Sequence, residues 1–557
     1  MGLFVRSRGG SKRTAAKRNV DRISVKKETA PAKAAQKEAV PAASAAEKTV
    51  SAEPVTKMPA ATVPAETIAP EKALEKEADA VFYYFNQIAA IPHGSHHTSE
   101  ISDYLVGFAK ERGLLVVQDD ANNVIITKSA SEGYEDAEPI ALQGHIDMVL
   151  ARDPEKKIDL LTEPVTVIED GDWMHADGTT LGADNGIAVA MMLALLDDDT
   201  LRHPLVECIF TADEEVGLIG ASSIDLTGLR SRRMLNLDSE SEGVFCAGCA
   251  GGADVVCTVP VKKKMRNGRI LRVKISGLTG GHSGSDIHKG GANAIRLLVR
   301  ALYSVCGTFP FRLISINGGD ANNAIPTNAE AQILFTEKDP ADEIERLFLE
   351  AGSTLAAEYK LTDPGLVCSV VTDASGEAEC VSGKKTRKIL EYLMALPTGV
   401  THMNPVIKGM PQTSLNLGII RTFSDHLQIE LMVRSGINSQ AGDLCDRLAC
   451  ISSGFGAESF VRSCYPAWEY RKDSPLRDLA SAVYRELTGK EPEVEVIHAG
   501  LECGILSGKV PGLDCISAGP NMQNVHTPRE RVSISSVKNV WNFVLALLEK
   551  AAERAAE

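Results

Sequence analysis

Hydrophobic positions recur at two different spacings along this chain, and the change of spacing predicts its elements. From residue 78 to 112 they follow the helical spacing, as Val81, Phe85 and Ile88 do, on both sides of a break at Ile91-Pro92. Farther along, short apolar runs predict strands and a longer run predicts a helix. The strands are expected at 123–127, 139–142, 205–211 and 234–237, and the helix at 187–196. This alternation indicates an α/β fold with a mixed, partly parallel sheet flanked by helices.

Residues 1–77 lack this pattern. They are rich in Ala, Lys, Glu, Pro and Thr, with almost no aromatic residue after Phe4. Such a segment cannot bury enough apolar surface to offset its chain entropy, so we expect a disordered, basic, low-complexity tail. The stretch from Met1 to Lys27 is basic and poor in acids. It is compatible with an organelle transit peptide as well as with a simple solvated tail.

Composition narrows the class of protein. The chain has 557 residues, 44% of them hydrophobic, and a formal charge of -15, with the positive charge concentrated in the tail. An acidic body argues against nucleic acid as a partner. No apolar run approaches the ~20 residues that a membrane span needs, and the start lacks the apolar core of a secretory signal. We therefore expect a cytoplasmic protein that binds no membrane.

Twelve cysteines occur at irregular spacings and form no disulfide framework. Cys246 and Cys249 form the one Cys-x-x-Cys pair. A structural zinc site would want a second such pair or histidines nearby, so we interpret these two as ordinary reduced thiols.

Histidines and carboxylates follow several of the predicted strands. The residues are His145, Asp147, Asp184, Glu214, Glu215, Asp238 and His526. Open α/β sheets place their sites at the carboxyl ends of strands, so these side chains are expected to converge on one edge. Each residue alone has an ordinary explanation, such as a helix cap, a turn residue or a solvated acidic run. Together, two imidazoles and three carboxylates suit a pair of divalent ions, with a spare Glu to activate water, which indicates a hydrolase.

The segments around these residues resemble those of a known family. They read LQGHIDMV (142–149), TTLGADNG (179–186), NLDS (236–239), CAGG (249–252), GGHSG (280–284) and HAGLECG (498–504). From about residue 80 to the C-terminus, the chain resembles the aminoacyl-histidine dipeptidases, within the aminoacylase and carboxypeptidase superfamily of two-zinc enzymes.

The resemblance implies a role for each residue of the metal site. His145 and Asp238 would bind one ion, Glu215 and His526 the other, and Asp184 would bridge them. Asp147 would orient His145, Glu214 would be the general base, and the Asp184-Asn185 peptide would be cis. The expected ions are two Zn²⁺, although the same ligand types also accept Co²⁺ or Mn²⁺.

The resemblance also implies an architecture. Residues 78–263 and 465–557 would form the catalytic domain, and 264–464 an inserted α+β lid, which explains why His526 lies so far from the other ligands. Within the lid, His282 and Asn323 would donate hydrogen bonds to the oxyanion, and Arg434 would bind the carboxylate of the dipeptide. Glu502 is expected either to bind the amino group or to serve as a structural hydrogen-bonding residue. One departure is Asp213. Relatives commonly have the motif Thr-Glu-Glu, whereas this chain reads Thr-Ala-Asp-Glu-Glu over residues 211–215, with an extra acid just before the glutamate pair.

The expected reaction is hydrolysis of unblocked dipeptides, including Xaa-His dipeptides such as β-alanyl-histidine. The alternatives are an aminotripeptidase, or an N-acyl amino acid deacylase or carboxypeptidase with the same metal site, and, further off, a binding scaffold without catalysis. The sequence leaves open the exact dipeptide preference, the native metal and whether the protein is a homodimer.

Overall fold

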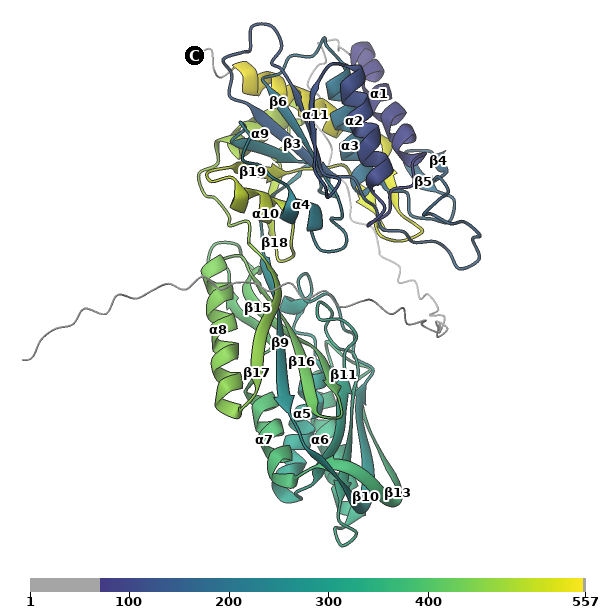
Figure 1. Ribbon diagram of the computed structural model, residues 1–557, viewed down its shortest axis with the longest axis vertical. Coiled ribbons are helices and arrows are strands. Elements are labelled where there is room, and N and C mark those ends of the chain that lie inside the picture. The colour runs from purple at the N-terminus through teal and green to yellow at the C-terminus, as the bar shows by residue number, and fades with distance from the viewer. Residues whose placement is uncertain (1–70, 554–557) are drawn as a thin grey trace, which may run out of the picture. The chain divides into compact units, whose positions relative to one another are not determined.

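The computed structural model describes residues 71–553. Most of the helices of this part of the chain pack on two large β-sheets (Figure 1). The first has eight strands in the order β1-β2-β6-β3-β7-β19-β8-β18. Strand β3 runs parallel to β6 and β7, β19 to β7, and β18 to β8, whereas the other pairs are antiparallel. The prediction of a mixed, partly parallel sheet is therefore confirmed. The strands are β1 (Leu115–Gln118), β2 (Val124–Lys128), β3 (Ile140–His145), β6 (Val206–Thr211), β7 (Arg233–Asn236), β8 (Val244–Cys249), β18 (Glu493–Ile497) and β19 (Asp514–Ser517).

Helices cover both faces of this sheet because alternate side chains of its central strands enter different cores. Leu142 and Cys208 pack in one core with α1, α3 and α11, whereas Ala141 and Ile209 pack in another with α4 and α10. The helices of this region are α1 (Glu71–Ala89), α2 (Ser99–Glu111), α3 (Ala183–Asp197), α4 (Ile219–Ser223), α9 (Pro475–Thr488), α10 (Glu502–Lys509) and α11 (Ile534–Glu553).

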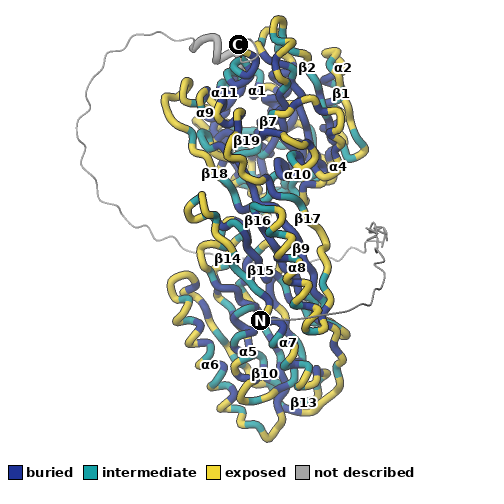
Figure 2. Tube along the Cα trace, turned by 90° about the vertical axis from the view of Figure 1, so that its left-hand side faces the viewer, coloured by how far each residue is buried: buried dark blue, intermediate teal, exposed yellow. Residues whose placement is uncertain are grey.

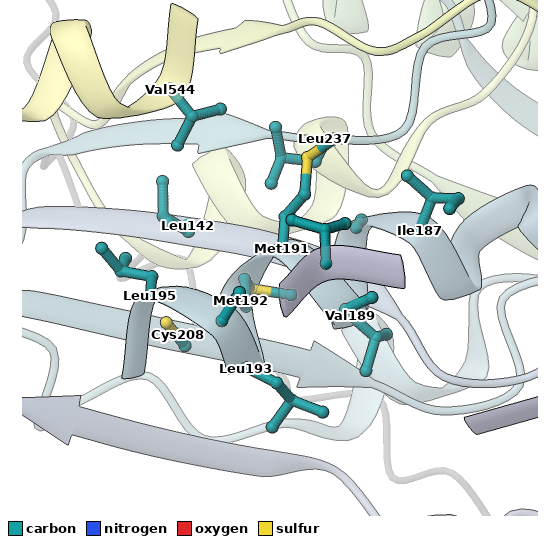
Figure 3. Close-up of a cluster of buried hydrophobic side chains, with 14 of the residues drawn as sticks. Leu142, Ile187, Val189, Met191, Met192, Leu193, Leu195, Cys208, Leu237 and Val544 are labelled. Carbon is teal, nitrogen blue, oxygen red and sulfur yellow. The ribbon is translucent and has the colours of Figure 1, made fainter. Parts of the chain in front are cut away.

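Helix α3 is the centre of the larger core. All of its residues except Asp184 and Asp197 are buried, as expected of a helix that is apolar on every side. Figure 3 shows its side chains, among them Met191 and Leu195, beside Leu142 of β3 and Val544 of α11. This packing fixes the helix that carries Asp184 at its first turn.

The second large sheet is antiparallel, in the order β13-β10-β12-β11-β15-β16-β9-β17, with β14 paired to β15. Helices α5, α6, α7 and α8 share one hydrophobic core with it, and Figure 2 shows β9, β15 and β16 as largely buried. Leu431 and Val433 of β16 enter that core, so Arg434, one position on, lies on the opposite face of the sheet. The elements are β9 (Gly251–Pro260), β10 (Lys263–Ser276), β11 (Arg312–Gly318), β12 (Ala329–Phe335), β13 (Val367–Val381), β14 (Gly399–Met403), β15 (Pro411–Thr422), β16 (His426–Ser435), β17 (Glu458–Tyr465), η1 (Ile287–Lys289), α5 (Ala294–Thr308), α6 (Ala341–Glu358), α7 (Gly383–Ala395) and α8 (Asn438–Phe455).

A small third sheet joins segments that are far apart in sequence. Its order is β20-β21-β5-β4, formed by β4 (Val167–Asp170), β5 (Trp173–Ala176), β20 (Met522–Gln523) and β21 (Arg531–Ser533). Pairing of β21 with β5 brings the segment after His526 beside the segment that leads into Asp184.

Most predicted elements are present, but two boundaries differ. The helices with a break at Ile91-Pro92 are α1 and α2, and the four predicted strands are β2, β3, β6 and β7. Helix α1 begins at Glu71, so residues 71–77, which we assigned to the tail, are helical; the rest of the predicted tail lies outside the described residues. The division at 264–464 stays a prediction. Strand pairing places β9 in the second sheet, between β16 and β17, so by this criterion the insertion begins before residue 264.

Within residues 71–553, no helix combines the length and the apolar character needed to cross a bilayer.

Candidate metal centre

Three neighbouring strands place most of the predicted site at one sheet edge. His145 is the last residue of β3, Glu214 and Glu215 follow β6, and Asp238 follows β7. Because β6, β3 and β7 are adjacent and parallel, their carboxyl ends meet at the same edge, where open α/β sheets bind ligands.

Asp184 lies between two histidines. Its Oδ1 is 3.1 Å from His145 Nε2, and its Oδ2 is 3.1 Å from His526 Nε2. Asp238 Oδ1 lies 3.6 Å from the same nitrogen of His145, and Glu215 Oε1 lies 2.7 Å from that of His526. These side chains form two groups, each with its ligand atoms within 4.8 Å of one another, and Asp184 belongs to both. The structure thus brings together the sets that the sequence predicts, while their role as ligands stays a prediction.

The donor atoms fit divalent ions. Glu215 Oε1 is buried and accepts no hydrogen bond, although His526 Nε2 is only 2.7 Å away. Two atoms that approach so closely without the alignment of a hydrogen bond are placed as two ligands of one ion would be. The imidazole nitrogens and carboxylate oxygens suit Zn²⁺ and related ions.

Charge in the centre is strongly coupled. Burial opposes a charge on His145, but the carboxylates of Asp147, Asp184 and Asp238 outweigh it and raise the pKa of His145 well above its usual value. The carboxylates of Asp184 and Glu215 beside the ring raise the pKa of His526 to about 11. Burial also opposes ionisation of Asp184, yet the two imidazoles outweigh it and lower the pKa of Asp184. Without bound ions, both imidazoles therefore carry protons at neutral pH.

Asp147 ties the histidine to the glutamate pair. Its Oδ1 lies 3.4 Å from His145 Nδ1 and accepts a hydrogen bond from the backbone N–H of Glu214 at 2.9 Å. Its Oδ2 accepts bonds from Ser95 Oγ and from the backbone N–H of Glu215. Asp147 is buried against Nδ1, the ring nitrogen of His145 that faces away from Asp184. The orienting role expected of it stays a prediction.

Glu214 lies within the same carboxylate cluster. Burial, together with the charges of Asp238, Glu502 and Glu215, raises the pKa of Glu214 well above its usual value. A carboxyl group with a raised pKa takes and returns a proton more readily near neutrality.

Asn185, in the first turn of α3, links the ends of β3 and β7. Its Oδ1 accepts a hydrogen bond from the backbone N–H of His145 at 3.2 Å, and its Nδ2 donates to the carbonyl of Leu237 at 2.8 Å. A Cβ at Gly144 would lie 2.4 Å from that Oδ1, so this position has to be glycine. The Asp184-Asn185 peptide is cis, as the family resemblance implies.

Sequence analysis did not identify Glu530, which holds the loop that carries Asp184. Its carboxylate is buried and accepts hydrogen bonds from the backbone N–H groups of Leu181, Gly182, Ala183 and Asp184, at 2.8 to 3.3 Å. Because Glu530 also follows His526 by four residues, it joins the loops of both ion groups. A contact across almost 350 residues leaves no local pattern that sequence reasoning would detect.

Glu502, predicted either to bind a substrate amino group or to be structural, is wholly buried. Its Oε2 accepts hydrogen bonds from Gln143 Nε2 and Thr211 Oγ1, both at 2.6 Å. Burial raises the pKa of Glu502 to about 7. These contacts favour the structural alternative, since the carboxylate lies against β3 and β6 and offers solvent no surface, although its Oε1 has no hydrogen-bond partner among the described residues.

Asp213, the departure from the family pattern, has a positive φ of 55°. Asp tolerates this left-handed conformation better than most residues, because its short side chain bonds locally. Asp213 Oδ1 accepts a hydrogen bond from the backbone N–H of His96 at 2.6 Å. The substitution is therefore compatible with the turn that positions Glu214 and Glu215.

Four strands of the second sheet present a polar row on the face opposite its helices. Ser414, Arg434, Gly252 and Tyr465 are paired in register across β15, β16, β9 and β17. A Cβ at Gly252 would lie 2.5 Å from the ring of Tyr465, so the missing side chain lets Arg434 and Tyr465 meet above it. There, Arg434 Nη1 donates to Tyr465 Oη at 3.0 Å.

Arg434 is 4% exposed and has no carboxylate partner among the described residues. Besides Tyr465, it donates to Ser283 Oγ at 3.4 Å and to His282 Nε2 at 3.3 Å. Burial, followed by the charge of Arg434, lowers the pKa of His282. A buried guanidinium among neutral groups is a site for an anion, because burying an unpaired charge is costly.

Asn323, the other predicted oxyanion donor, lies beside His282. The backbone N–H of Ser283 donates to the carbonyl of Asn323 at 2.7 Å, and His282 forms a β-bridge with Ala324. The Asn323 residue is exposed. His282, Asn323 and Arg434 therefore gather at one place in the second sheet.

The cysteines remain thiols, as predicted. Cys246 and Cys249 are free and buried, and burial raises the pKa of each.

Known proteins are similar to this chain over nearly all of its described residues. The model of Peptidase family M20/M25/M40 matches residues 141–550. The cytosol non-specific dipeptidase of Escherichia coli (strain K12) is 35% identical over 468 residues, which cover 84% of this chain and 96% of that protein. The crystal structure of the aminoacylhistidine dipeptidase from Vibrio alginolyticus superposes with a TM-score of 0.78 at 34% identity, covering 85% of this chain and 96% of that one.

Glu530→Gln should weaken metal binding. An amide in place of the carboxylate turns an N–H₂ group toward backbone donors, so the loop of Asp184 loses its fixed position. We expect the affinity for Zn²⁺ to fall roughly 10- to 100-fold, as it does when a group supporting a ligand is lost. Competition with a chromogenic chelator measures the affinity, and Glu549→Gln, on the exposed side of α11, is the matched control. An unchanged affinity in a folded variant would remove Glu530 from the site.

Loading the metal-free protein should release protons. His145 and His526 are protonated at pH 7 without ions, because their pKa values are raised, and an imidazole must be neutral to bind a metal. Apparent affinity should therefore fall as pH falls, by about tenfold per pH unit for each proton displaced. Titration calorimetry in two buffers of different ionisation enthalpy counts the protons. Heats that do not depend on the buffer would contradict the assignment of both histidines as ligands.

Proposed function

Since the chain belongs to peptidase family M20/M25/M40 and is thus a hydrolase of peptide bonds, we propose that it cleaves unblocked dipeptides, including Xaa-His dipeptides. The observation that carries the proposal is the pair of ligand groups that share Asp184, with Glu214 beside them. The names of the two relatives, both dipeptidases, support the substrate class.

Seven residues would form the catalytic centre. His145 and Asp238 would hold one ion, His526 and Glu215 the second, and Asp184 both. Two Zn²⁺ ions there would lower the pKa of a shared water and polarise the carbonyl of the substrate. Asp147 would keep His145 in the orientation and tautomer that expose Nε2, since its carboxylate and its backbone carbonyl both face Nδ1.

Glu214 would move the proton. It takes a proton from the attacking water and later delivers it to the amine that leaves, so one carboxyl group serves as base and then as acid. Its burial among Asp238, Glu215 and Glu502 suits this exchange, because those charges stabilise the protonated form.

The dipeptide would be held by its carboxylate. Arg434 is buried, fixed by Tyr465 and Ser283, and unpaired with any acid among the described residues, so a bidentate carboxylate completes its surroundings. This clamp limits the substrate to peptides whose C-terminus lies one residue beyond the cleaved bond.

Carboxylate binding would also prepare the oxyanion site. In the structure, Arg434 Nη2 donates to His282 Nε2, which occupies the lone pair of that nitrogen. When the guanidinium turns to a carboxylate, Nε2 becomes free to carry a proton and, with Asn323, to donate to the oxyanion.

We place the enzyme in the cytoplasm because of its cytosolic relative, and its partners are small peptides. Organelle import, which depends on residues 1–27, has no support from the comparisons and lies outside the described residues. A homodimer remains a hypothesis that light scattering decides.

Glu214→Gln should abolish turnover and leave the metal in place. The amide cannot accept the proton of water, so we expect kcat for Ala-His to fall roughly 10²- to 10⁴-fold while the metal content is unchanged. Release of histidine and elemental analysis measure the two, with the exposed Glu169→Gln as control. Retained activity would show that another group is the base. If the wild-type protein cleaved N-acylated amino acids or tripeptides well but not free dipeptides, one of the alternative activities would replace the proposal.

Arg434→Lys should raise KM for dipeptides and spare their amides. The ammonium keeps the charge but loses the two-pronged contact, a loss of about 1.5–3 kcal/mol, or roughly 10- to 100-fold in kcat/KM. Ala-His amide lacks the carboxylate, so wild type and variant should cleave it at similar rates. Equal losses on both substrates would show that Arg434 supports the fold and does not bind the carboxylate; thermal unfolding of the variant checks this directly.

A further inference from the structure

A small cavity lies next to the polar row, and the functions assigned above do not use it. Its volume is about 150 Å³, several times the roughly 30 Å³ that one water occupies in the liquid. The walls are mainly apolar and include Pro405, Val406, Trp468 and Val496, while His498 contributes a ring. Apolar walls with one polar group are typical of a pocket for a side chain.

Register places this cavity directly beyond Arg434. Ser414 is the partner of Arg434 in the β15–β16 ladder, and Gly436 continues the ladder by donating its N–H to the carbonyl of Gln412 at 2.8 Å. Side chains two positions apart share one face of a strand, so Arg434 and Gly436 lie on the same face, about 7 Å apart along it. Gly436 and Gln412 both line the cavity.

Gly436 leaves the floor of the cavity open. A Cβ built there would meet only the carbonyl oxygen of Gln412, at 4.0 Å, and Gly436 is not among the residues with positive φ. The position therefore has neither steric nor conformational need for glycine. Because Gly436 lines the cavity, a side chain at this position would take up part of its space.

His498 links the cavity to the clamp. It is 4% exposed, and its Nε2 forms a 2.7 Å hydrogen bond with Ser414 Oγ, beside Arg434. Its Nδ1 is buried without a hydrogen-bond partner. Burial, together with the charge of Arg434, lowers the pKa of His498 to about 3, so the ring is neutral at physiological pH. Because Nδ1 is buried, the ring contributes bulk to the wall of the cavity and its bond to Ser414 fixes that wall beside Arg434.

We propose that this cavity receives the side chain of the second residue of the dipeptide, with Gly436 as its floor. The proposal rests on the proposed function, because it starts from a substrate whose carboxylate is bound to Arg434. The side chain leaves the atom next to that carboxylate, so a cavity one step along the same face lies within its reach. Dipeptides with a large side chain in second place fill the apolar space, whereas those ending in glycine leave it empty.

Gly436→Val tests the proposal by filling the floor. We expect kcat/KM to fall at least tenfold for Ala-His and Ala-Leu, and to change less than threefold for Ala-Gly, which needs no pocket. Gly436→Ala should show the same order with smaller effects. Gly442→Val, at an exposed glycine on α8 with open space around it, is the matched control.

The outcomes separate the two hypotheses. If the wild-type protein cleaved none of the three dipeptides, the proposed function itself would fail. If it cleaved them and Gly436→Val lowered all three rates equally, or none, the cavity would not be the side-chain pocket.

Discussion

The centre depends on the position of one carboxylate, that of Asp184. Its two oxygens face His145 and His526, which enter from segments almost 400 residues apart, so a rotation of this side chain would separate both ligand groups at once. Several contacts hold the backbone that carries this side chain. Packing of α3 in the larger core fixes the helix, Asn185 ties its start to the ends of β3 and β7, and the carboxylate of Glu530 holds four successive N–H groups. The geometry of a two-ion site thus follows from the burial of an apolar helix.

The second sheet holds the Arg434 guanidinium without a carboxylate partner among the described residues. Arg434 belongs to a row in which Gly252 has no side chain, and this gap lets Tyr465 reach the guanidinium from two strands away. Neutral donors and acceptors then satisfy part of the guanidinium while the charge stays unpaired. Binding of a carboxylate would supply the missing charge. If Arg434 holds the carboxylate of a dipeptide, as proposed, the span between this row and the metal centre would set the length of the peptide.

The sequence predicts residues that strand ends bring together and misses those that tertiary contacts place. His145, the Glu214–Glu215 pair and Asp238 follow apolar runs, so their convergence can be expected from the rule for parallel sheets. Glu530 follows no such run, and its partners lie in a loop far away in the sequence. Glu502 shows the opposite limit, since its motif indicated a functional residue but only burial distinguishes a substrate contact from a structural one. Strand β9 shows a further limit, since its apolar residues would suit either sheet and only its pairing with β16 and β17 assigns it to the second.

Strands β20 and β21 of the third sheet and Glu530 lie late in the sequence, so the ligand groups become complete at different stages of synthesis. His145, Asp184 and Asp238, which make up one ligand group, leave the ribosome early, whereas the group of Asp184, Glu215 and His526 is complete only after the segment that ends with β21 has been made and has paired with β5. If these groups bind two ions as proposed, the second ion can be held only once almost the whole chain has been synthesised.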